Sequence, residues 1–179
     1  METYKEAISE YKLEDNEGKI KIVYAYFGLA VYHSQCLEEC FSSMLCAIRI
    51  SKRKVRNNAE MTEIVDAIES SKTTMGQSIN EVKQVYNLPD KITKELSFIL
   101  DKRNFLIHKY FKLEISKFYS EQGQCEMLQY FCNFIDEEQK IEAQLNPYYQ
   151  IFANRLGITD KKVEQMMMQM IKKEKERVG

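Results

Sequence analysis

Residues 19–51 read KIKIVYAYFGLAVYHSQCLEECFSSMLCAIRIS, and their apolar side chains recur at intervals of three and four. This spacing predicts one long α-helix and places its main apolar face at eight positions: Ile22, Tyr26, Leu29, His33, Leu37, Cys40, Met44 and Ile48. The opposite face is also largely apolar, at Val23, Phe27, Val31, Phe41 and Leu45. A helix that is apolar on several sides is expected at the centre of a bundle, covered by other helices.

The rest of the chain also has helical spacing, interrupted at a few positions. A short helix is expected before Gly18, and others at about residues 61–68, 73–86, 90–111, 125–145 and 159–177. Pro147 is expected to kink or end its helix. The whole sequence has only two prolines and six glycines in 179 residues, with no Asn-Gly or Asp-Gly hairpin signal, which favours helix throughout.

These patterns predict an all-α fold, an up-and-down bundle of four to five helices with an extra C-terminal helix. A single domain is expected over residues 1–157. Residues 158–179 are expected to form an amphipathic helix rich in methionine, which packs either on its own bundle or on a partner. A helix this short is marginal in isolation, so the sequence leaves both docking alternatives open.

Composition narrows the classes of function. The net charge is −1, with 26 basic and 27 acidic residues, so only a local basic patch could bind nucleic acid. No signal peptide and no apolar stretch long enough to span a membrane is evident. Five cysteines, none in a Cys-x-x-Cys pair, favour reduced thiols in a cytoplasmic protein.

Several isolated features have an ordinary structural interpretation. His33 is expected to be a hydrogen-bonded core histidine, with a place in a functional cleft as the alternative. Cys36 and Cys40 could ligate zinc, but two further ligands are not visible, so buried thiols are favoured. The basic run at residues 52–56 is expected to be a solvated helix end rather than an RNA contact.

Residues 101–111 read DKRNFLIHKYF and carry the main functional signal. On a helix, Asn104 and His108 lie four positions apart on one face, and Arg103 lies about 100° away around the axis. A guanidinium, an amide and an imidazole beside Lys102 and Lys109 suit a phosphodiester. The alternative is a solvated helix face on which Arg103 pairs with a carboxylate, either Asp101 or a glutamate on a neighbouring helix.

Arg103, followed directly by Asn104, then His108 and Tyr110, resembles the signature of the HEPN superfamily. These are α-helical bundle domains of many bacterial toxins and antiviral ribonucleases, and the Arg-x4-His-x-Tyr spacing is most similar to the HepT type of toxin. The resemblance covers residues 73–111 in sequence and 20–145 in architecture.

The resemblance implies a homodimer whose two motifs face each other and cleave RNA without metal or another cofactor. His108 would move protons during attack of the 2′-hydroxyl on the phosphate, and Arg103 would stabilise the charge that develops. Asn104 would orient the imidazole. Lys102, Lys109 and Lys112 would hold the RNA backbone.

Tyr110 matches the tyrosine that, in HepT-type systems, a partner nucleotidyltransferase modifies with AMP. Bulk and negative charge beside His108 would block the groove, so a cognate antitoxin of this kind is a possible partner. The chain itself has no nucleotidyltransferase signature. The alternative is a catalytically inactive HEPN-fold module that binds nucleotide, RNA or a protein partner through the same face.

Overall fold

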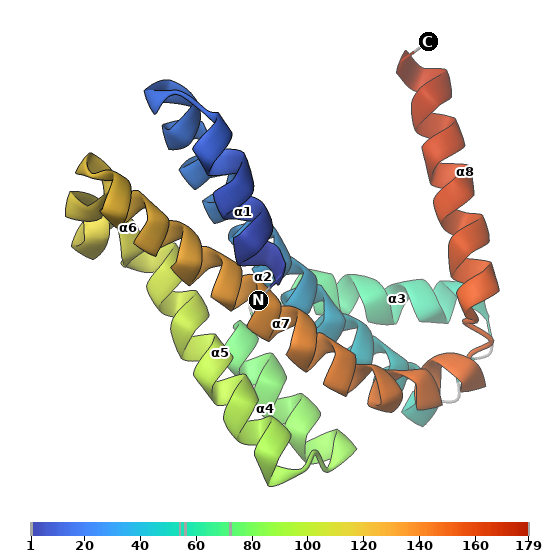
Figure 1. Cartoon of the computed structure of the whole chain (residues 1–179). Helices are drawn as coiled ribbons and strands as arrows, with labels where there is room; N and C mark the ends of the chain where they lie inside the picture. The colour runs from blue at the N-terminus through green and yellow to red at the C-terminus, as the bar shows by residue number, and fades with distance from the viewer. Residues whose placement is uncertain (1, 54, 56, 72, 179) are drawn as a thin grey trace.

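The computed structural model describes residues 2–53, 55, 57–71 and 73–178. These residues contain eight α-helices, one 3-10 helix and no strand, so the all-α prediction is confirmed. The elements, labelled in Figure 1, are α1 (Glu2–Leu13), α2 (Asn16–Arg53), α3 (Asn58–Glu69), α4 (Met75–Tyr86), α5 (Asp90–His108), α6 (Tyr110–Glu114), the 3-10 helix η1 (Ile115–Tyr119), α7 (Glu121–Arg155) and α8 (Asp160–Val178).

The two longest helices, α2 and α7, lie side by side in the bundle (Figure 1). They run in the same direction, because Lys19 pairs with Glu121 at their beginnings and Cys40 lines the same groove as Glu142 farther along. Helix α1 runs antiparallel to α7, with Tyr11 bonded to Gln124 near the start of α7 and residue 3 bonded to residue 136.

Helix α5 is also antiparallel to α7. Its Lys102 pairs with Glu137, whereas Glu95, one to two turns earlier on α5, accepts a hydrogen bond from Gln144 farther along α7. Helices α1, α2, α5 and α7 therefore alternate in direction along the chain, as the up-and-down prediction requires. Helices α3 and α4 are inserted between the second and third of these bundle helices.

The predicted central helix is present, but its buried face is rotated from the one expected. Leu29 is 38% exposed and His33 is half-buried, whereas Ala30 and Ser34 are fully buried. The reason is that a helix with apolar residues on several sides has no unique orientation in its own sequence, so its neighbours determine which face is inside. The prediction of a core position for His33 is therefore wrong, and its ring contacts Tyr32 edge-on.

The helix ends follow local chemistry. Thr74 and Gln77 form a reciprocal capping box at the start of α4. Asn87 closes α4 in the left-handed conformation, at φ 49°, and Pro89 follows. Helix α5 was expected to reach residue 111 but ends at His108, since the chain turns at Lys109 with φ −131°.

Pro147 was expected either to kink or to end its helix. The end is wrong, because α7 continues through this residue to Arg155. Proline removes the N–H that would bond to the carbonyl of Ala143. Both Ala143 and Pro147 are exposed, so solvent can satisfy that carbonyl.

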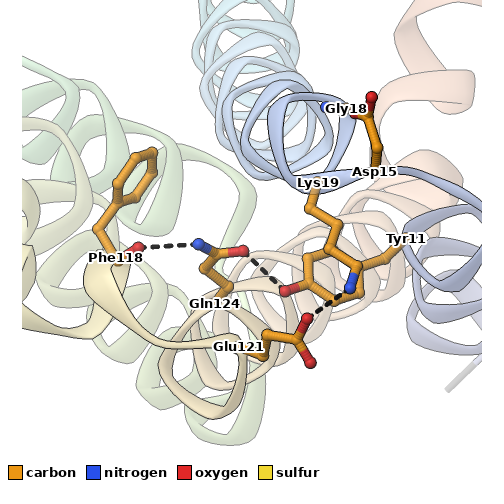
Figure 2. A network of polar contacts seen from close by, with 7 residues as sticks. All are labelled: Tyr11, Asp15, Gly18, Lys19, Phe118, Glu121 and Gln124. Atoms are coloured by element: carbon orange, nitrogen blue, oxygen red, sulfur yellow. Dashed lines mark hydrogen bonds and ion pairs between the residues drawn. The ribbon is translucent and has the colours of Figure 1, made fainter.

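A polar network fixes the end of the bundle where α1, η1 and α7 meet (Figure 2). The Tyr11 hydroxyl donates to Gln124 Oε1 at 2.7 Å, and Gln124 Nε2 donates to the carbonyl oxygen of Phe118 at 2.8 Å. Beside it, Lys19 Nζ lies 2.5 Å from Glu121 Oε1. The Tyr11–Gln124 bond ties α1 to the beginning of α7, and the Lys19–Glu121 pair ties α2 to it. The bond from Gln124 to Phe118 holds η1 against α7.

Helix α8 points away from the bundle at the end of α7 (Figure 1). Its described side chains are all exposed, and its large apolar residues range from 42% exposed at Val163 to 68% at Met170. The structure does not show α8 packed on its own bundle, which was one of the two alternatives for this helix. The other alternative, contact of α8 with a partner, stays a prediction. Among the described residues, no helix is long and apolar enough to cross a membrane.

Candidate functional site

Arg103 occupies a core position of α5. The buried residues of this helix recur at Ile92, Leu96, Ile99 and Leu106, and Arg103 falls on the same three-and-four spacing. Its side chain is only 19% exposed and points toward α2. The motif arginine is therefore directed into the bundle rather than onto an open helix face.

Three protein oxygens receive the N–H groups of Arg103. Nε donates to Ser34 Oγ at 3.4 Å, one terminal nitrogen donates to Asn104 Oδ1 at 3.2 Å, and the other lies 3.4 Å from Glu38 Oε2. These distances are long for hydrogen bonds. The arginine–carboxylate pair with a neighbouring helix, which was the structural alternative for Arg103, is thus present as the contact with Glu38. The contact of Arg103 with Asn104 was not expected from the sequence.

Glu138 of α7 is a site residue that sequence reasoning missed. It is 2% exposed, and neither carboxylate oxygen has a hydrogen-bond partner among the described residues. Burial raises the pKa of Glu138 to about 8; the charge of Arg103 opposes the rise and Glu142 adds to it. The available signal was its spacing, since it lies three residues after Ile135 and seven before Leu145 on the buried face of α7.

His108 and Asn104 lie on exposed positions of the last turns of α5, one turn apart. Within the described part of the chain, no hydrogen bond joins His108 to Arg103. The structure thus brings Arg103 and Asn104 together, places His108 near them along the same helix, and leaves the imidazole open to solvent.

The expected basic rim is only partly free. Lys102 turns toward α7, where its Nζ lies 2.6 Å from Glu137 and 4.5 Å from the centre of the Phe98 ring. Lys109 follows His108 directly and Lys112 comes three residues later, and both lysines are exposed. Two of the three predicted lysines are therefore available to an anionic ligand, and the third is engaged in an ion pair.

Tyr110, the predicted modification site, is 2% exposed. The centre of its ring lies 4.8 Å from the ring centre of Tyr130 and 4.9 Å from that of Phe131. Burial raises the pKa of its hydroxyl. The residue also lines a hollow of about 290 Å³ with Glu114 and Lys117. Attachment of a nucleotide would require this ring to leave its packed position, and the modification stays a prediction.

A groove of about 560 Å³ lies between α2 and α7 and is lined by Cys36, Cys40, Glu142 and Tyr149 among others. The two cysteines were expected to be buried but are half-buried. Burial raises the pKa of Cys40 to about 11, with Glu142 adding to the effect. In the described part of the chain, no three His, Cys, Asp or Glu side chains are placed to hold a metal ion.

Of the basic run at residues 52–56, Lys52 and Arg53 are exposed at the end of α2, while Lys54 and Arg56 lie outside the described residues.

The candidate site thus consists of Arg103 with Asn104 and the buried Glu138, the exposed His108, and the lysines at 109 and 112. Comparison of the chain with protein-family models, with curated proteins and with solved structures gives no match.

Proposed function

We propose that the chain is a metal-independent, HEPN-type endoribonuclease of a bacterial defence or toxin–antitoxin system, active in the cytoplasm as a homodimer. The observation that carries the proposal is the arrangement on the last turns of α5. There the guanidinium of Arg103 reaches Asn104 at 3.2 Å, and the imidazole of His108 is exposed one turn later.

The chemistry needs a proton acceptor, a proton donor and a cation. One imidazole takes the proton of the 2′-hydroxyl as that oxygen attacks the adjacent phosphorus. A protonated imidazole gives a proton to the leaving 5′-oxygen, which leaves a 2′,3′-cyclic phosphate and a 5′-hydroxyl. The Arg103 guanidinium donates to the phosphoryl oxygens, where negative charge develops.

Of the two histidines in the chain, His108 belongs to the motif on α5, whereas His33 lies on α2, where it is half-buried and its ring packs against Tyr32. Two imidazoles with separate roles are obtained when two copies pair with their α5 ends facing each other. Lys109 and Lys112 of each copy would then border the groove and bind the RNA backbone. A cognate nucleotidyltransferase that silences the site through Tyr110 is part of the same proposal.

A second candidate is a non-catalytic module that binds RNA, nucleotide or a protein partner through the same face. The observation that favours it is the engagement of Arg103 by Ser34, Glu38 and Asn104. An arginine held in this way has fewer N–H groups to offer to a phosphate.

The test is RNA cleavage by the purified protein in the presence of EDTA. We expect His108→Ala and Arg103→Lys to abolish cleavage, and the control His33→Ala to retain it. Circular dichroism of each variant verifies that the bundle is folded. Cleavage that persists in both motif variants would contradict the ribonuclease proposal.

The same variants distinguish the second candidate. A wild-type protein that binds RNA without cutting it, and loses binding in His108→Ala, would establish the non-catalytic module instead. Lys109→Ala with Lys112→Ala is expected to weaken binding and to reduce its dependence on salt, because two phosphate contacts are lost.

A further inference from the structure

Ser34, Arg103 and Glu138 form a polar layer within the bundle, one residue from each of α2, α5 and α7. Their neighbours along each helix are apolar and buried, such as Leu37 on α2 and Ile135 on α7. Buried polar side chains are normally paired, and each unpaired one calls for a physical explanation. In this layer Ser34 and Arg103 are bonded to each other, whereas both oxygens of Glu138 are without a partner among the described residues.

Arg103 has a carboxylate on either side of it. Glu38 of α2 lies toward the surface, with its side chain 39% exposed, and is 3.4 Å from the guanidinium. Glu138 of α7 lies in the core, and the contact between the preceding residues, Lys102 of α5 and Glu137 of α7, places the two helices side by side here. Among the described residues, Arg103 contacts the outer carboxylate, Glu38, and the inner carboxylate, Glu138, has no partner.

The other charged groups around this layer do not neutralise Glu138. Glu142, one turn later on α7, is acidic and raises its pKa further. Lys102 of α5 is paired with Glu137 on the outer side of α7. Two carboxylates of α1, Glu6 and Glu10, act on Cys132, earlier on α7. Among the described residues, Arg103 is therefore the cation that acts on the Glu138 carboxylate.

We infer that Glu138 is a positioning residue for Arg103, whose guanidinium it draws into the core when ionised and releases toward Glu38 and Asn104 when protonated. The inference rests on the proposed function in one respect, namely that the released position is the one that serves the RNA site. The two positions differ in which carboxylate Arg103 contacts and in how far it is from the exposed end of α5. Uptake of one proton by a core residue would thereby determine how Arg103 is presented at the surface.

The sign of the linkage follows from the raised pKa. Between the ordinary value of 4.5 and about 8, the folded chain binds this proton more strongly than the unfolded chain does. The stability contributed by protonation is therefore fully present below pH 4.5 and is lost as the pH rises to about 8. The melting temperature should fall across this window.

The experiment compares the full-length chain with Glu138→Gln, which keeps the side chain neutral and nearly the same size. We expect the wild-type Nε and Cζ chemical shifts of Arg103 to change with pH around the folded-state pKa of Glu138, at about 8, which is the pH at which the fall in melting temperature levels off. Both changes should be absent in Glu138→Gln. Glu137→Gln, which removes the adjacent carboxylate outside the core, should behave like the wild type.

Glu38→Gln provides a second, independent variant. It removes the outer carboxylate, so Arg103 should stay with Glu138 and the midpoint should move to lower pH. Arg103 shifts that do not change with pH in the wild type, or that change equally in Glu138→Gln, would overturn the positioning role. These measurements do not involve RNA.

RNA cleavage then tests the link to the proposed function. The wild-type rate should fall as Glu138 loses its proton, and the rate of Glu138→Gln should persist to higher pH. A wild-type protein that cleaves no RNA would contradict the ribonuclease proposal alone, because the Arg103 signals still decide the positioning role. Cleavage by both proteins with identical pH profiles would contradict the claim that the released position of Arg103 serves the RNA site, and would leave the ribonuclease proposal standing.

Discussion

Two helical glycines should respond in opposite directions to substitution by alanine. A Cβ atom on Gly123, in the first turn of α7, would lie 2.1 Å from the carbonyl oxygen of Lys117 and 2.6 Å from its Cα. Both atoms are backbone of η1, so no change of rotamer relieves the overlap. A Cβ atom on Gly28, in the middle of α2, would meet nothing within 4 Å.

The magnitudes follow from these distances. Non-bonded carbon contacts are ordinarily about 3.5–4 Å, so η1 must move by about 1 Å or more to admit the methyl group. Overpacking of this kind costs about 1–3 kcal/mol, and the gain in helix propensity offsets up to about 1 kcal/mol of it. We expect Gly123→Ala to lower the free energy of unfolding by about 2 kcal/mol and Gly28→Ala to raise it by about 1 kcal/mol.

The assay is urea unfolding of the two variants and the wild type, followed by far-ultraviolet circular dichroism. The hydrogen bond from the Gly123 N–H to Ser120 Oγ at 3.1 Å is available in both glycine and alanine, so loss of the helix cap does not confuse the comparison. A Gly123→Ala protein as stable as the wild type would show that η1 is not packed against α7 as the structure has it.

Two further predictions concern α8. Dilute peroxide should oxidise the methionines of residues 166–170 well before the buried Met44 and Met127, as measured by mass spectrometry of proteolytic peptides, because sulfoxide formation follows exposure. Equal rates at the two sets would contradict the exposed placement of the helix. Deletion of residues 158–179 should leave the melting temperature of the monomeric bundle unchanged, since the described α8 side chains are exposed; a fall of several degrees would indicate that the helix packs on the bundle.

The presence of the helices and their approximate positions were predictable from the sequence, because the spacing of apolar residues along the chain is a local pattern. The stretch 19–51 forms one helix, and the break at residues 87–90 occurs where Asn87 and Pro89 place it. The orientation of α2 about its axis was not predictable, since apolar residues occur on several of its faces and the packing of other helices selects among them. The continuation through Pro147 depends on local exposure, which the sequence does not specify.

The motif residues of the candidate site were predictable from the sequence, whereas their arrangement in space was only partly predictable. The exposure of His108 one turn after Asn104 agrees with the helical spacing, whereas the contact of Arg103 with Asn104 was not expected. That Arg103 would point into the core was not evident, because a single charged residue on an apolar stripe is usually assigned to the edge of the helix. Glu138 was missed for the same reason, and only the packing of three helices brings it close enough to Arg103 to be affected by its charge.

The docking of α1 on α7 has a consequence for how the chain is made. The two hydrogen bonds that join α1 to α7 connect residues separated by 113 and 133 positions in sequence. During synthesis, α1 can pack on α2 early, but the surface that it buries against α7 stays exposed until nearly the whole bundle has left the ribosome. Such distant pairings slow folding and expose apolar surface to other chains in the meantime. The bundle should therefore fold late in synthesis, once α7 has been made and can pack on α1.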